Sequence, residues 1–165
     1  MPIPALSGGV LPVGRHPATE AEVEARFVSA SEFGESTTRQ DIWHDWTMAL
    51  GAAQALMQVC AVWIGGSFAT SALNPDDLDA VLILDRRRID ALAMDPTAQR
   101  ALSAFANGGV LRSQTGWRVD TYVLPWVADP QGEGLVLGVN TYLEMRGYWD
   151  DFRSHPSSLA SLGRC

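Results

Sequence analysis

The sequence predicts an α/β protein of the α+β type, in which helices flank a central mixed β-sheet. The strongest signal is a stripe of apolar side chains at helical spacing over residues 39–58, typical of a helix that packs on a sheet. Two short apolar runs, over residues 60–64 and 78–84, are typical of buried strands. At 165 residues the chain is expected to form one domain.

The amino-terminal region is expected to form an extended arm and then a short helix. Residues 1–18 hold four of the nine prolines and three glycines, a composition that disfavours regular structure. Thr19 and Glu22 form a capping-box pattern, which predicts a helix over residues 20–30 ahead of the long helix.

Two more helices and a third strand are expected in the second half of the chain. Asp95-Pro96 is a helix N-cap followed by a proline at the first helical position, and this helix is expected to end at Gly108-Gly109. Residues 117–124 alternate in polarity and predict a strand, with Val119 and Asp120 on opposite faces. A last amphipathic helix is marked by Tyr142, Met145, Trp149 and Phe152. The final dozen residues are expected to form a frayed tail.

The charge of the chain excludes several chemistries. All 12 basic residues are arginines, against 19 acidic residues, so the net charge is −7. Without a lysine, the chain has neither a Walker A phosphate-binding lysine nor a Schiff-base lysine. Its acidity also argues against non-specific binding of nucleic acid, which requires a basic surface.

The sequence also predicts a cytoplasmic protein that does not enter membranes. Cys60 and Cys165 do not form a disulfide framework, which favours a reducing compartment. Residues 1–13 have no basic segment and are interrupted by proline and glycine, unlike a signal peptide. No window approaches the roughly 18 apolar residues of a membrane span.

The first candidate site motif is Gly65-Gly66-Ser67, directly after the first predicted strand. Two glycines let the backbone approach a ligand closely, and a serine at a turn offers a hydroxyl beside free N–H groups. These groups suit a phosphate, although the same tripeptide also serves as a plain turn.

The second candidate motif is Asp77-Leu78-Asp79, at the start of the second predicted strand. Side chains alternate along a strand, so both carboxylates point to one face, about 7 Å apart. The two charges repel unless a cation lies between them, and oxygen ligands of this kind favour Mg²⁺. The alternative is a solvated turn that leads into the strand.

The third candidate is Asp120, in the middle of an apolar strand, where a carboxylate is costly unless it is paired or bound to a metal. Arg118 lies on the same face and offers a simple ion pair as one explanation. If the second and third strands are neighbours, Asp120 instead joins Asp77 and Asp79 in a cluster suited to two-metal phosphoryl transfer. Arg118 and Trp126 are candidate substrate contacts, Trp126 by stacking on a base.

Together these motifs resemble those of a known superfamily. Gly66-Ser67, then nine residues, then Asp77-Leu78-Asp79, with a later strand carboxylate in Val119-Asp120-Thr121, resembles the signature of polymerase-beta-type nucleotidyltransferases. More narrowly, the segments 11–16, 63–70 and 74–79 resemble a family of small stand-alone nucleotidyltransferase-like proteins of bacteria and phages, the DUF6932-like family. The likeness covers roughly residues 10–150.

The resemblance implies a minimal nucleotidyltransferase fold over residues 19–153, between an arm over 1–18 and a tail over 154–165. It also implies roles for the motifs. Asp77 and Asp79 bind two Mg²⁺ (or Mn²⁺) ions, and Asp120 binds the catalytic ion and helps to deprotonate the acceptor. The phosphate-binding residues would be Gly65, Gly66 and Ser67.

The expected activity is therefore transfer of a nucleoside monophosphate from an NTP to a hydroxyl of an RNA, a protein or a small molecule. By resemblance, such a protein fits a toxin–antitoxin or phage-conflict setting, with a partner protein encoded nearby. One alternative is a module of the same fold that no longer catalyses and acts as a nucleotide-binding or antitoxin-like partner. Another is a phosphohydrolase or nuclease that uses water as the nucleophile.

Overall fold

The computed structural model describes residues 3–92, 94–126 and 159–162, and it has the predicted α+β architecture around a mixed sheet. Its elements in chain order are β1 (Arg15–Pro17), α1 (Glu20–Phe27), the 3₁₀ helix η1 (Ser31–Phe33), α2 (Arg39–Leu56), β2 (Val59–Gly65), the 3₁₀ helix η2 (Ser67–Ala69), β3 (Leu78–Asp85), α3 (Arg86–Leu92), α4 (Pro96–Ala106), α5 (Val110–Thr115), β4 (Val119–Trp126) and β5 (Leu159–Leu162).

The sheet has the strand order β1-β5-β2-β3-β4. β2 runs antiparallel to both of its neighbours, β3 and β5, whereas β3 and β4 are parallel, as are β1 and β5. The three central predictions, strands near 60–64, 78–84 and 117–124, are confirmed as β2, β3 and β4. The parallel pairing of β3 with β4 needs the crossover formed by α3, α4 and α5 between them.

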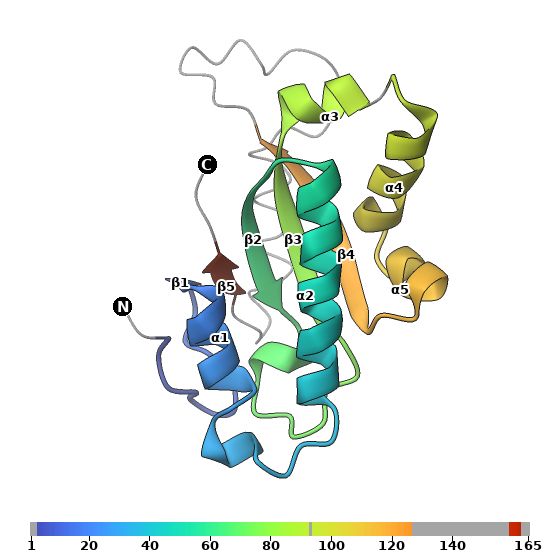
Figure 1. Cartoon of the computed structure of the whole chain (residues 1–165). Helices are drawn as coiled ribbons and strands as arrows, with labels where there is room; N and C mark the ends of the chain where they lie inside the picture. Colours follow the sequence, from blue (N-terminus) through green and yellow to red (C-terminus); the bar gives the residue numbers. More distant parts are fainter. Residues whose placement is uncertain (1–2, 93, 127–158, 163–165) are drawn as a thin grey trace.

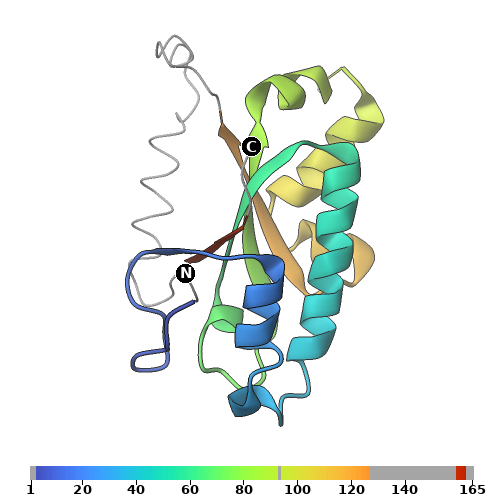
Figure 2. The same cartoon turned by 60° about the vertical axis from the view of Figure 1, so that its left-hand side comes forward.

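One face of the sheet carries the main core, because α2 runs along it (Figure 1). The apolar stripe of α2, including Ile42, Trp46 and Ala53, is buried in one cluster with the alternate side chains of β3 that begin at Leu78. Figure 2 shows α1 and α2 on the same side of the sheet. Phe105 of α4 also joins this cluster. The long helix is thus confirmed, together with its role of packing on a sheet.

The opposite face of the sheet carries a smaller cluster. It is formed by Cys60, Trp63, Val81, Ile83 and Leu124, with Tyr122 and Trp126 packed against it. Because side chains alternate along a strand, Asp79 shares this second face with Val81, and Asp120 shares it with Tyr122 and Leu124. The second face is therefore apolar toward one end and carboxylate-bearing toward the other.

Local signals at two helix starts are confirmed. Thr19 Oγ1 accepts a hydrogen bond from the backbone N–H of Glu22 at 3.2 Å, and the Glu22 carboxylate accepts one from the Thr19 N–H at 2.7 Å. Asp95 caps α4 by accepting from the N–H of Thr97 at 2.8 Å. Side-chain caps of this kind are decided within a few residues, which is why sequence reasoning locates them well.

The two ends of the chain differ from expectation. The predicted frayed tail is wrong for residues 159–162, which form β5 between β1 and β2. The arm contributes the short strand β1, which pairs with β5. Strand pairing joins residues that are far apart in the chain. Strands of three or four residues are also too short to show a periodic pattern in the sequence. The helix expected around Tyr142 to Phe152 lies outside the described residues.

Two further findings bear on the expected compartment. Cys60 is disulfide-bonded in the structure, so the cysteines do not support the expectation of a reducing compartment. Among the described residues, no helix combines the length and the apolar character needed to cross a membrane.

Candidate active site

Two of the predicted carboxylates lie side by side on neighbouring strands. β3 and β4 pair in register, so that Asp79 and Asp120 are direct Cα partners. Both side chains point to the second face, where they are only partly exposed. The condition that the second and third predicted strands be neighbours is therefore met, and it brings together two residues that are 41 positions apart.

Asp77, one residue before β3, belongs to the same acidic group. Burial raises the pKa of the Asp77 carboxyl above its ordinary value, and the negative charge of Asp120 raises it further. Arg112 opposes this effect, because its guanidinium Nη1 donates to Asp77 Oδ2 at 2.8 Å. The pKa of Asp77 is thus raised chiefly by burial and secondly by the neighbouring carboxylate, and Arg112 offsets only part of this increase.

The turn at Gly65-Gly66-Ser67 lies directly against Asp79. Gly65, the last residue of β2, is the register partner of Asp79. Gly66 has φ 72° and ψ −163°, a conformation open essentially only to glycine. A Cβ at Gly66 would overlap Asp79 Oδ2 and lie 2.8 Å from Asp79 Cγ. Glycine is therefore required here both for the turn and for the space that Asp79 occupies.

Ser67 begins η2, and its side chain is exposed. Its carbonyl oxygen accepts hydrogen bonds from the N–H of Thr70 at 3.2 Å and from Thr70 Oγ1 at 2.7 Å. These bonds fix the backbone of the turn while leaving the Ser67 hydroxyl at the surface. The predicted phosphate-binding tripeptide and the carboxylates thus meet at one end of the sheet.

A buried arginine holds the loop that follows this turn. Arg39, at the start of α2, is 1% exposed. Its guanidinium donates to four backbone carbonyls, those of Phe27, Phe68, Thr70 and Ala72. It also stacks on the ring of Phe33, 3.8 Å from the centroid. Burial lowers the pKa of Arg39 to about 10, so it remains a cation at neutral pH. Arg39 therefore ties α1, α2 and the turn together.

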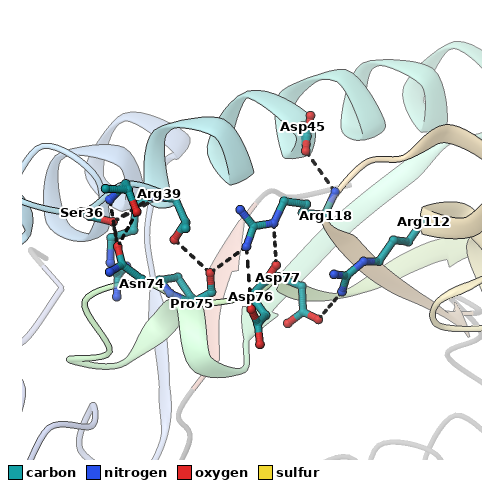
Figure 3. Close-up of polar contacts among 11 residues, drawn as sticks. Ser36, Arg39, Asp45, Asn74, Pro75, Asp76, Asp77, Arg112 and Arg118 are labelled. Atoms are coloured by element: carbon teal, nitrogen blue, oxygen red, sulfur yellow. Dashed lines mark hydrogen bonds and ion pairs between the residues drawn. The ribbon is translucent and has the colours of Figure 1, made fainter.

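The loop of residues 74–77, which precedes β3, is also fixed by hydrogen bonds (Figure 3). Asn74 Oδ1 accepts a hydrogen bond from the N–H of Thr37 at 2.8 Å, and Thr38 Oγ1 donates to the carbonyl of Pro75 at 2.9 Å. These contacts come from the segment just before α2. Residues 74–77, which lead into β3, are thus anchored to the segment before α2.

Arg118 contacts the loop that precedes β3, in place of the ion pair expected with Asp120. It donates to the carbonyl of Asp76 at 2.8 Å and to that of Pro75 at 3.2 Å, and its own N–H donates to Asp45 of α2 at 3.0 Å. Its described ion pair is with Asp76, at 3.9 Å, and not with Asp120. These bonds direct the Arg118 guanidinium to the loop before β3, and its role as a substrate contact stays a prediction.

Trp126 is not at the carboxylate end of the sheet. It is the last residue of β4 and the register partner of Asp85, six positions beyond Asp79 on β3. At about 3.3 Å per residue this places it about 20 Å from the carboxylates. It lies in a strand and not in a loop, so stacking on a base bound at Asp79 is not supported.

Sequence reasoning missed two groups that contact the carboxylates. One is Arg112 of α5, and the other is Gly109, whose N–H donates to Asp120 Oδ1 at 3.1 Å. No local pattern marks either of them, because both contacts depend on how α5 packs beside β4. Arg39 did carry a signal, since an arginine occupies a position of the apolar stripe that continues with Ile42 and Trp46.

The donor set at this site is made of carboxylate oxygens. Within the part of the chain that the structure describes, no three acidic, histidine or cysteine side chains are arranged to hold a metal ion as they lie. Asp77 instead contacts Arg112, and Asp120 accepts from the N–H of Gly109. The carboxylate oxygens, and the nearness of the Asp77 and Asp120 charges, nevertheless suit a divalent cation.

We expect Asp77→Asn to raise the free energy of unfolding at pH 7. The folded-state pKa of Asp77 is raised even though Arg112 is its partner, so the charged carboxylate opposes folding at pH values above that pKa. As the pH falls through it, the wild type takes up the proton and the difference from the variant shrinks. Urea unfolding at pH 7 and at lower pH measures both effects. A variant less stable than the wild type at pH 7 would contradict the expectation.

Comparison with known proteins identifies the family but no function. No curated protein and no solved structure gives a significant match to the chain. One family model, described as a family of unknown function (DUF6932), matches residues 4–160. The chain therefore belongs to the DUF6932 family, whose function is unknown.

Proposed function

We propose that this protein is a magnesium-dependent nucleotidyltransferase, which transfers a nucleoside monophosphate from an NTP to a hydroxyl of an RNA, protein or small-molecule acceptor. The observation that carries the proposal is the register pairing of Asp79 with Asp120, together with the close contact between Gly66 and the Asp79 carboxylate. Carboxylates beside a turn with an exposed serine hydroxyl provide metal ligands and a hydrogen-bond donor for a phosphate.

The residues that would hold Mg²⁺ or Mn²⁺ are Asp77, Asp79 and Asp120. When bound, the ions would polarise the transferred phosphate and lower the pKa of the acceptor hydroxyl. The space beside Gly66 is filled by Asp79, so the phosphates would be bound by the exposed Ser67 hydroxyl, which can donate to them. With no lysine in the chain, backbone N–H groups and arginines supply the remaining donors.

The proposed reaction forms one bond and breaks one. The acceptor oxygen bonds to the α-phosphorus of the NTP, and the bond from that phosphorus to the oxygen bridging to the β-phosphorus breaks. Pyrophosphate leaves with the electron pair of the broken bond. The proton of the acceptor hydroxyl passes to Asp120, which is the carboxylate assigned as its base.

The test is the labelling of acceptors in cell extract. We expect the wild type, incubated with Mg²⁺ and NTPs labelled in the α-phosphate, to transfer label to macromolecules or small molecules. Asp77→Asn and Asp79→Asn should each lower this transfer by at least about 100-fold, since each removes a ligand charge. Asp90→Asn is the matched control, because Asp90 lies on α3 and pairs with the exposed Arg86 at 2.8 Å. Equal labelling by the wild type and the Asp77 and Asp79 variants would refute the mechanism.

A second candidate is a non-catalytic module that binds a nucleotide or a partner protein, in the manner of an antitoxin. One observation favours it: Asp77 is already paired with Arg112, and the described carboxylates do not form a metal group as they lie. Calorimetry with ATP and Mg²⁺ separates the two candidates. Metal-dependent ATP binding that disappears in Asp79→Ala supports the enzyme, and absence of binding supports the partner role.

A further inference from the structure

One short segment of the chain contacts two of the three candidate carboxylates. Gly109 donates its N–H to Asp120 at 3.1 Å, and Arg112, one helical turn later, donates to Asp77 at 2.8 Å. The two contacts hold Asp77 and Asp120 to α5 and its N-cap. Figure 3 shows the Arg112 guanidinium directed at the Asp77 carboxylate from the side opposite Arg118.

The neighbouring arginines cannot take over the role of Arg112. Arg118 is engaged with the Pro75 and Asp76 carbonyls, and Arg39 is buried against four others. Arg112 differs from both, because its side chain is 41% exposed and its described partner at the site is a carboxylate. Its guanidinium can therefore leave Asp77 and remain solvated, because the Arg112 side chain is not buried.

We infer that Arg112 exchanges partners: it neutralises Asp77 while the site holds no metal ion, and it binds a phosphate of the nucleotide once Asp77 binds the ion. This inference rests on the proposed function. A divalent cation bound to Asp77 competes with the guanidinium for the same carboxylate charge and repels it. The released guanidinium remains on α5 beside Asp77, the carboxylate that would hold the ion, and its planar fork of donors matches phosphate oxygens.

The exchange predicts opposite effects of one substitution on two ligands. In Arg112→Gln, Mn²⁺ alone should bind about three- to tenfold more tightly, because its competitor for Asp77 is gone. ATP in saturating Mg²⁺ should bind about tenfold more weakly, because a phosphate contact is lost. A residue that merely supports the fold would not tighten one ligand while weakening the other. Calorimetric titrations of the full chain measure both affinities.

Two further variants complete the experiment. Arg112→Lys keeps the charge and should bind Mn²⁺ as the wild type does. Arg100→Gln removes an exposed arginine of α4, which contacts Thr97, and should leave both affinities unchanged. If the wild type binds Mn²⁺ and Arg112→Gln binds it no more tightly, or binds ATP as well as the wild type, the exchange is refuted and the proposed function stands. If the wild type binds no Mn²⁺, both are refuted.

Discussion

Arg39→Met is expected to lower the free energy of unfolding by about 3–5 kcal/mol, because two of its acceptors, the carbonyls of Phe27 and Phe68, are buried, and each buried acceptor left without a donor costs about 1–3 kcal/mol. Methionine keeps much of the apolar contact with Phe33 but leaves the carbonyls of Phe27, Phe68, Thr70 and Ala72 without the guanidinium that now satisfies them. Urea unfolding followed by circular dichroism measures the loss.

Two controls separate this effect from loss of a charge in general. Arg26→Met removes a partly buried arginine, 18% exposed, whose ion pair with the exposed Glu32 spans 2.6 Å. It should cost less than Arg39→Met, because none of the four carbonyls that Arg39 satisfies loses its donor. Arg39→Lys keeps the cation but cannot span four carbonyls with one ammonium, so it should recover only part of the loss. If Arg39→Met were no less stable than Arg26→Met, the buried guanidinium would not be holding the turn.

Gly66→Ala is expected to cost about 2–4 kcal/mol, as the sum of backbone strain and overpacking. Gly66 combines φ 72° with ψ −163°, and an added Cβ would overlap the Asp79 carboxylate. Because Asp79 must turn away to make room, the variant should also lose metal-dependent ATP binding. Thermal unfolding and calorimetry measure the two effects separately.

A double-mutant cycle isolates the clash between Gly66 and Asp79. In an Asp79→Ala background the overlapping atoms are gone, so Gly66→Ala should cost only the backbone strain. Gly8→Ala is the matched control, because Gly8 also has a positive φ, 62°, but no atom lies within 4 Å of an added Cβ. Equal costs of Gly66→Ala in the wild-type and Asp79→Ala backgrounds would show that Asp79 does not lie against the turn.

Local patterns accounted for the elements that build the site. The apolar stripe from Ile42 onward predicted α2, and the capping box at Thr19 predicted α1. Both succeed because helical periodicity and caps depend on residues a few positions apart. Likewise, period-two alternation assigned Asp120 to the face opposite Val119. Local pattern failed for β1 and β5, which are three and four residues long and exist only because each finds a neighbouring strand.

The sequence by itself determined which residue types could form a metal and phosphate site, namely Gly65-Gly66-Ser67, Asp77, Asp79 and Asp120. Tertiary structure decided their relations: the parallel register sets Asp79 beside Asp120, and α5 brings Arg112 to Asp77. It also placed Trp126 at the opposite end of β4 and directed Arg118 to the loop before β3. The physical reason is range, since propensity and alternation act over a few residues, whereas register and charge pairing join segments separated by 35 or more positions.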